Sequence, residues 1–303
     1  MNRFKPYLQI VRLPNLFTAA ADSLAGWLIV TGSLDEPRRW LPLVLASVAI
    51  YAAGIVLNDV FDFEIDRNER PNRPLPSGRV SWRLAAWFGG VSLVLGPILA
   101  GLSGSPASFV VGLALAAAVL AYDAGLKKTW LGPESMGLCR GLNLLLGMSQ
   151  APALGGPSAW LIAGSLGLFV VGVTWISRSE VATGQIRGIV LGVVVEQWGL
   201  LGLIASAMAT VMVARGNGTE IASTVIPGAV VWCAVTIVIN RANYKAIRNP
   251  VAEVVQRAVK TGVLSLVWLD VVAVTTVQGP LAGLTVACLW IPAFLLGKWL
   301  YST

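Results

Sequence analysis

The chain has 303 residues, of which 56% are hydrophobic and only 12% are charged, and its mean hydropathy is +0.73. Because a soluble domain carries about 25% charged residues, this composition excludes a soluble globular protein and predicts an integral membrane protein with one membrane domain. The net charge of +7 does not indicate binding to nucleic acid, since the basic residues are scattered between apolar segments.

Apolar stretches long enough to span a bilayer follow one another along the chain. A transmembrane helix needs about 20 apolar residues, and neither loose backbone nor a sheet edge can face lipid. The candidate spans are 14–31, 41–58, 83–102, 105–122, 136–154, 159–177, 188–213, 221–240, 260–277 and 281–300. The last two are separated only by Gln278-Gly279-Pro280, so the predicted fold is all-α, a polytopic transmembrane bundle of nine or ten spans around a central cavity.

Charge in the loops predicts how the bundle is oriented. Eighteen basic residues fall on one face of the predicted topology and three, Arg38, Arg39 and Arg215, on the other, with Lys298 unassigned. The positive-inside rule therefore predicts a multi-pass protein whose N-terminus and charged loops lie in the cytoplasm. The N-terminal stretch is interpreted as a retained first helix rather than a signal peptide, because Asn15 and Asp22 interrupt its apolar core.

The residue types available limit the chemistry. The sequence contains no histidine, which excludes Ser-His triads, His-ligated metals and His general bases. Cys139, Cys233 and Cys288 lie in apolar stretches without the spacing of metal ligands, so they are interpreted as packing residues. Any chemistry must use Asp, Glu, Lys, Arg, Tyr, Asn or a metal bound by oxygen.

The most heavily charged stretch is NDVFDFEIDRNERPNRPLPSG, residues 58–78, at the cytoplasmic end of the second span. If the helix continues through it, Asp59, Asp62 and Asp66 occupy positions i, i+3 and i+7 and share one stripe, with Asn58 beside them. Three carboxylates repel one another unless a cation neutralises them, and oxygen ligands favour a hard ion such as Mg²⁺, which leaves positions for phosphate oxygens. The alternative is a solvated acidic helix end.

Arginines follow the acidic stripe directly. Arg67, Arg70 and Arg73 are good donors to phosphate, because a guanidinium binds phosphate oxygens in pairs. A hard-metal site beside an arginine cluster at a membrane surface is typical of a protein that binds a diphosphate on a lipid tail.

The string Asn58-Asp59-x-x-Asp62-x-x-x-Asp66, followed by RPNRPLPSGRVS, resembles the first aspartate motif of the UbiA superfamily of intramembrane prenyltransferases. Residues 121–147, AYDAGLKKTWLGPESMGLCRGLNLLLG, are similar to the Tyr-to-Lys loop and the next helix of that family. The resemblance implies one UbiA-like domain over 1–303 that transfers a prenyl group from a prenyl diphosphate to a lipophilic acceptor, for example an aromatic one. It also implies Mg²⁺ as cofactor.

The resemblance implies roles for individual residues. The catalytic set is Asp59, Asp62, Asp66 and Lys127, with the three aspartates as metal ligands. The expected substrate-binding set is Asn58, Arg67, Arg73, Tyr122, Asp123, Arg140, Asn143, Arg178 and Glu180. Arg140 and Asn143 belong here because charge inside a membrane usually faces a cavity. Asp22, Glu196, Gln197 and Asp270 are further intramembrane polar residues without an assigned role.

The sequence departs from the family pattern in one loop. Family members usually carry a second Asp-rich motif after the sixth helix, whereas TWISRSEVATGQIRG, residues 174–188, contains only Glu180 as an acid. Arg178 is expected to neutralise phosphate in place of a second metal. An exposed ion pair between Arg178 and Glu180 is the alternative. The missing motif also leaves a second function open, a non-catalytic binder or carrier of prenyl lipids descended from the enzyme. The expected partners are the two substrates and membrane lipid, with no nucleic acid and no obligatory protein partner.

Overall fold

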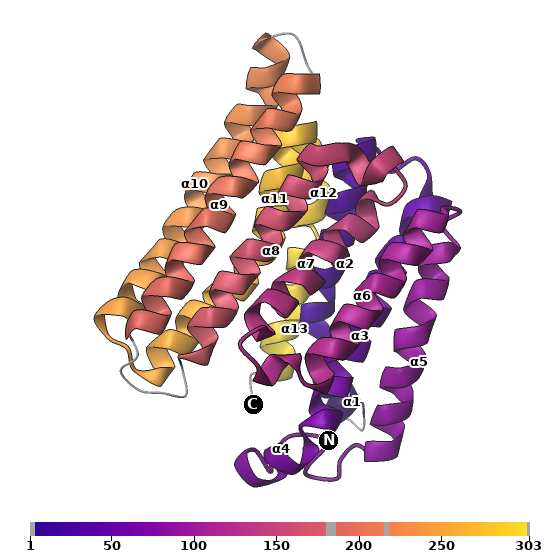
Figure 1. Cartoon of the computed structure of the whole chain (residues 1–303), viewed down its shortest axis with the longest axis vertical. Coiled ribbons are helices and arrows are strands. Elements are labelled where there is room, and N and C mark those ends of the chain that lie inside the picture. Colours follow the sequence, from indigo (N-terminus) through magenta and orange to yellow (C-terminus); the bar gives the residue numbers. More distant parts are fainter. Residues whose placement is uncertain (1–3, 180–185, 215–217, 302–303) are drawn as a thin grey trace.

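The computed structural model describes residues 4–179, 186–214 and 218–301, and the regular elements in these ranges are all helices (Figure 1). In chain order the elements are α1 (Lys5–Ile10), α2 (Leu13–Thr31), α3 (Pro37–Phe61), α4 (Phe63–Glu69), α5 (Trp82–Gly101), α6 (Pro106–Ala124), η1 (Leu126–Lys128), α7 (Gly132–Met148), η2 (Pro152–Gly155), α8 (Gly156–Arg178), α9 (Ile186–Ala214), α10 (Gly218–Arg248), α11 (Ala252–Gln278), α12 (Pro280–Ala287) and α13 (Trp290–Tyr301). The long helices form one bundle, and α1 and α4 lie at the end that holds both termini (Figure 1).

Nine helical segments within the described residues are long and apolar enough to cross a membrane, and α12 with α13 counts as one of them. Helix α7 lies among these segments, although it has only 17 residues. The predicted all-α bundle of nine or ten spans is therefore confirmed. Ten crossings, counting α7, agree with the position of both chain ends at the same end of the bundle (Figure 1).

Proline and glycine explain where several helices begin and end. Pro14, Pro37 and Pro106 stand in the first turns of α2, α3 and α6, where the missing N–H costs nothing. Gly32 ends α2 in the left-handed conformation, with φ of 74°. The predicted span 281–300 is broken between α12 and α13, because Pro292 cannot donate the helical hydrogen bond to the carbonyl four residues before it.

Helices α2 and α7 pack backbone against backbone at the centre of the bundle. A Cβ added at Gly147 would lie 1.9 Å from the carbonyl oxygen of Ser23, and one at Gly26 would lie 2.1 Å from the carbonyl oxygen of Leu144. Small residues allow such close approach between membrane helices. This contact fixes α7 against α2 and so fixes the positions of the polar side chains that α7 carries.

Replacing Gly147 by Ala is expected to destabilise the fold by about 1–3 kcal/mol, the usual cost of overpacking, because the new methyl group would push α2 and α7 apart. Gly164→Ala in α8 is the matched control, since a Cβ there meets nothing within 4 Å. Thermal unfolding in detergent should lower the midpoint for Gly147→Ala and leave it unchanged or raised for Gly164→Ala. Equal midpoints for the two variants would contradict the tight contact.

Candidate active site

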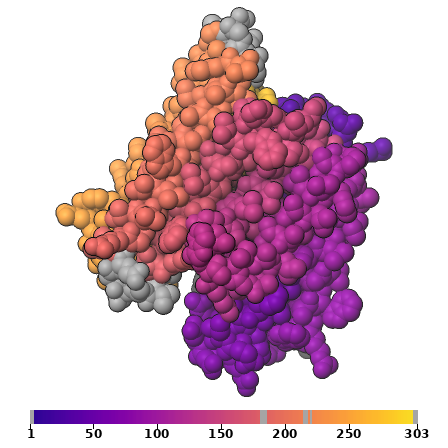
Figure 2. Space-filling view, in the orientation of Figure 1, coloured from indigo at the N-terminus to yellow at the C-terminus, as the bar shows by residue number. Residues whose placement is uncertain are grey.

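A cavity of about 760 Å³ opens at the end of the bundle where α3, α4, α6 and α7 meet. In Figure 2 the indigo-to-purple N-terminal part of the chain projects beyond the other helices at the lower end of the molecule. The charged side chains that line this mouth cavity are Arg12, Asp62, Asp66, Glu69, Arg70, Arg73, Asp123, Lys127 and Lys128. Opposite charges are therefore mixed around a single opening.

The sequence pattern assumed one continuous helix through the three aspartates, but the structure breaks this helix between α3 and α4. Asp62 stands between α3 and α4 with φ of −93° and ψ of 9°, so the chain changes direction at this residue. Arg73 Nη1 lies 3.6 Å from Asp59 Oδ1 and 2.6 Å from Asp66 Oδ2. These two carboxylates therefore lie on the same side of the segment. Asp62 instead faces Lys127, at 2.7 Å.

Each aspartate of the stripe has a cationic partner. Asp59 lies 3.2 Å from Arg12, Asp62 pairs with Lys127, and Asp66 pairs with Arg73. Within the described ranges, no three His, Cys, Asp or Glu side chains come together as a site for a metal ion. The three carboxylates are therefore not a preformed metal cage made by protein groups alone.

The donor set nevertheless fits Mg²⁺ that is bound together with a phosphate ligand. Mg²⁺ is usually held by one or two carboxylates, several waters and phosphate oxygens rather than by an all-protein cage. Asp62 and Asp66 line one cavity. Asp59 lies near Asp66, because Arg73 contacts both carboxylates. Hard carboxylate oxygens beside a cavity of about 760 Å³, which has room for a phosphate group and waters, meet that requirement.

Tyr122, Asp123 and Lys127 extend the mouth from the end of α6 into η1. The side-chain amide of Asn58 donates a hydrogen bond to Asp123 Oδ1 at 3.0 Å. Asp123 Oδ2 is buried and has no hydrogen-bond partner among the described residues. One carboxylate oxygen of the mouth is thus free to accept a proton or a hydrogen bond.

Arg178 lies differently from the arrangement expected from the sequence. Its guanidinium donates to the backbone carbonyls of Lys127 at 3.0 Å and Thr129 at 2.5 Å, and Arg178 is not among the residues that line the mouth cavity. These contacts hold the loop that carries Lys127, and they predict that Arg178 acts on the site through that loop. Arg67 is exposed on α4 and does not line the cavity either, and Glu180 lies outside the described residues.

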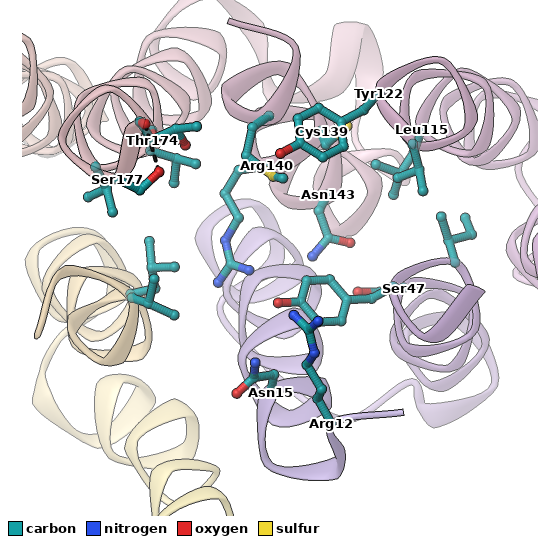
Figure 3. Close-up of a pocket in the computed structure, with 18 of the residues that line it drawn as sticks. Arg12, Asn15, Ser47, Leu115, Tyr122, Cys139, Arg140, Asn143, Thr174 and Ser177 are labelled. Carbon is teal, nitrogen blue, oxygen red and sulfur yellow. Dashed lines mark hydrogen bonds between the residues drawn. The ribbon is translucent and has the colours of Figure 1, made fainter. Parts of the chain in front are cut away.

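An inner cavity of about 410 Å³ lies deeper between α2, α3, α6, α7, α8 and α11, and Figure 3 shows its lining. Its walls are mainly apolar, with Val170, Val173 and Leu266 among them. The two cavities share seven lining residues: Arg12, Tyr51, Val119, Tyr122, Met136, Cys139 and Ser177. One continuous space therefore leads from a charged mouth into an apolar interior, which is the expected central cavity.

Arg140 and Asn143 line the inner cavity from α7 (Figure 3), and both side chains contact Asp22 of α2. Arg140 Nη2 lies 2.7 Å from Asp22 Oδ1, and the Asn143 amide donates to Asp22 Oδ2 at 2.8 Å. Asp270 of α11 approaches the same carboxyl group. The predicted intramembrane polar network exists, and it joins three helices around the cavity floor.

Arg12 is the site residue that sequence reasoning missed, because it had been counted only as a charge that orients the N-terminus. It lines both cavities and pairs with Asp59. It also adopts a left-handed backbone conformation, with φ of 46°, at the break between α1 and α2. The sequence did contain a signal for this role: a basic residue two positions before Pro14, predicted on the same side of the membrane as the aspartate motif.

These observations define a class: a polytopic helical membrane protein with a charged mouth above an apolar cavity. The profile of the UbiA prenyltransferase family matches residues 19–251. The chain belongs to the UbiA prenyltransferase family, as the resemblance of its aspartate motif implied.

Individual relatives share a name. The digeranylgeranylglyceryl phosphate synthase of Sulfolobus acidocaldarius is 32% identical over 189 residues, which are 61% of this chain and 63% of that protein. The enzyme of the same name from Methanocaldococcus jannaschii is 36% identical over 99 residues, 33% of this chain and 35% of that protein. The matched regions span less than two thirds of the length of these relatives.

Two solved structures have a similar fold. One comes from work on digeranylgeranylglyceryl phosphate synthase in membranes and superposes with a TM-score of 0.63 at 20% identity, covering 92% of this chain and 100% of the other. The apo structure of a UbiA homologue from Aeropyrum pernix K1 gives 0.62 at 18% identity, covering 84% and 94%. At these identities the likeness supports the fold alone.

Removing Arg140 is expected to cost about 3–5 kcal/mol of stability, because Asp22 would remain as a buried charge without its partner. Arg140→Gln should therefore lower the unfolding midpoint in detergent strongly. The double variant with Asp22→Asn should recover part of the loss, because it removes the stranded charge. A double variant that is destabilised by the full sum of the single changes would contradict the pairing.

Arg178→Ala is expected to weaken the binding of inorganic diphosphate to the mouth about tenfold, more than the ~1 kcal/mol of a surface salt bridge. The reason is indirect, since the loop that carries Lys127 would lose both contacts to the guanidinium. Arg187→Ala is the control, because Arg187 is an exposed arginine at the start of α9. Calorimetric titration measures both, and equal affinities would show that Arg178 does not position Lys127.

Proposed function

We propose that the protein transfers a prenyl group from a prenyl diphosphate to a glycerol hydroxyl of a prenylated glycerol phosphate. One observation carries the proposal: three carboxylates and their three cationic partners lie at or next to the mouth of a cavity whose inner walls are mainly apolar. A prenyl diphosphate has the same division, with a charged head and an apolar tail. The family of the chain and the name that its relatives share support the same function.

The diphosphate of the donor would lie at the mouth and its first carbon at the entrance to the inner cavity. Asp59, Asp62 and Asp66 would hold Mg²⁺ together with the diphosphate oxygens, and the ion would stabilise the negative charge that develops on the leaving group. Arg73 and Lys127 would neutralise the remaining charge through charge-assisted hydrogen bonds. Such groups act most strongly where water is scarce.

Transfer would break the bond between the allylic carbon and the diphosphate oxygen, and the electron pair would leave with the diphosphate. The hydroxyl oxygen of the acceptor would then form the new bond to that carbon and lose its proton. Asp123 Oδ2, which has no partner among the described residues, would accept this proton. The apolar lining of Val170, Val173 and Leu266 would exclude the water that competes for the same carbon.

A second apolar space would accept the chain of the acceptor, since the name of the relatives describes a glyceryl phosphate with two geranylgeranyl groups. A groove of about 580 Å³ lies between α2, α10, α11 and α13 and is lined by Trp268, Trp290 and Phe294 among others. It shares Asn15 and Val263 with the inner cavity. The two chains would therefore meet at the inner cavity from different directions.

Two expectations from the sequence are refined in this proposal. The acceptor becomes a prenylglycerol phosphate instead of an aromatic compound, because the relatives are named for a glyceryl phosphate product. The non-catalytic carrier finds no support in relatives that are named synthases. One domain over 1–303 with a cytoplasmic mouth remains part of the proposal, supported by the excess of basic residues on that face.

The test is an assay with purified protein in lipid nanodiscs, labelled geranylgeranyl diphosphate and Mg²⁺. Geranylgeranylglyceryl phosphate is expected to yield a doubly prenylated product, whereas a hydroxylated aromatic acid is expected to yield none. Asp62→Ala should lower turnover at least about a hundredfold, as expected for lost charge stabilisation, without lowering the unfolding midpoint. Product from the aromatic acceptor alone would overturn the acceptor assignment. Binding of the diphosphate without any product would favour the carrier.

A further inference from the structure

The charges at the mouth cancel before any ligand is present. Asp59, Asp62 and Asp66 contribute three negative charges, and their partners contribute three positive ones. The aspartates are mostly covered, with side chains 7%, 23% and 6% exposed. A free divalent cation would therefore have to displace cations already close to the carboxylates, in a partly desolvated site where charge interactions are stronger than in water.

Arg12 is the most exposed of the three cationic partners. Its side chain is 37% exposed at the break between α1 and α2, and it pairs with Asp59, which is 47 residues away in the sequence. Its side chain also lines the passage between the mouth and the inner cavity (Figure 3). A guanidinium in that position is close both to a carboxylate and to the path of a ligand's head group.

We infer that the mouth works by exchange of ion-pair partners, with Arg12 acting as a positioning and selectivity residue. Without ligand, the cations occupy the carboxylates and keep free Mg²⁺ out. When a diphosphate arrives with its metal, Arg12, Arg73 and Lys127 turn from the aspartates to the diphosphate oxygens, and the released carboxylates take the metal. The inference rests on the proposed use of a diphosphate substrate.

Exchange makes the two ligands depend on each other. A metal alone would lose the attraction of carboxylates that are already paired, and a diphosphate alone would have to compete with carboxylates for the cations. Together they compensate each other, because the metal faces the released carboxylates and the diphosphate faces the released cations. Binding of the pair should therefore be cooperative, and the coupling must be the same whichever ligand is added first.

The test uses Mn²⁺ as metal probe, followed by electron paramagnetic resonance, and inorganic diphosphate as anion probe, on the full chain in detergent. Arg12→Gln is expected to bind Mn²⁺ about fivefold more tightly in the absence of diphosphate, the size expected for one ion pair. In the presence of Mn²⁺, the same variant should bind diphosphate about fivefold more weakly. The two affinities thus move in opposite directions. Loss of a merely structural residue would lower both.

Two variants separate pairing from general electrostatics. Arg70 lines the same cavity but has no carboxylate partner among the described residues, so Arg70→Gln should change Mn²⁺ affinity less than twofold (roughly, by screening of exposed charge). Arg12→Lys keeps the charge and should restore Mn²⁺ affinity to the wild-type value.

Equal effects of Arg12→Gln and Arg70→Gln, or an unchanged Mn²⁺ affinity in Arg12→Gln, would overturn the exchange. A wild-type protein that binds no diphosphate even with Mn²⁺ would instead refute the proposed function, and the exchange with it. Because neither probe carries a prenyl chain or an acceptor, the outcome does not depend on which acceptor the protein uses.

Discussion

A charged group next to hydrocarbon must have a partner, and this constraint organises the polar part of the molecule. Burying an ion costs several kcal/mol unless an opposite charge and hydrogen bonds compensate, and the buried aspartates around the cavity and its mouth, Asp22, Asp59, Asp66 and Asp123, each have a basic group or an amide as partner. Asp59 is paired with Arg12, and Asp22 is paired with Arg140. The pairs connect segments far apart in sequence, such as α2 with α7 and η1 with the α3–α4 junction, and so help to set the shape of the cavity.

The two sets of pairs differ in depth, and this difference divides their roles. Asp22 is fully buried and Arg140 almost so, which makes their contact costly to break and suits a permanent support for the cavity floor. The mouth cations are more exposed than Arg140: Arg12 is at 37% and Arg73 at 29%, although Lys127 is at only 10%. Partners that water can reach are able to leave their carboxylates at low cost, and this suits groups that must change contacts during binding.

The helices could be predicted from the sequence because hydropathy alone determines which segments enter a membrane, and the apolar stretches were long and clearly separated. Their ends were less predictable. Pro292 splits the last span into α12 and α13, and α7 is shorter than its apolar stretch suggested. The aspartate motif could also be recognised in the sequence, because its spacing is local. The cationic partners of the aspartates could not be predicted, since a contact such as Lys127 with Asp62 depends on the packing of α6 against α3. The contacts of Arg178 could not be predicted for the same reason, as its guanidinium turns to backbone carbonyls that no sequence pattern marks.

Two requirements conflict at position 12, the left-handed backbone and the ion pair with Asp59, and no single residue type meets both. A residue with a Cβ gives up about 1 kcal/mol in this conformation, whereas glycine adopts it freely, so stability of the α1–α2 corner favours glycine. The carboxylate of Asp59 favours arginine. Substitution of Arg12 by glycine would therefore stabilise the fold, and only selection for function at the mouth would act against it. Across descendants of this sequence, the residue at this corner should reveal whether such selection is still acting, independently of any measurement on the protein itself.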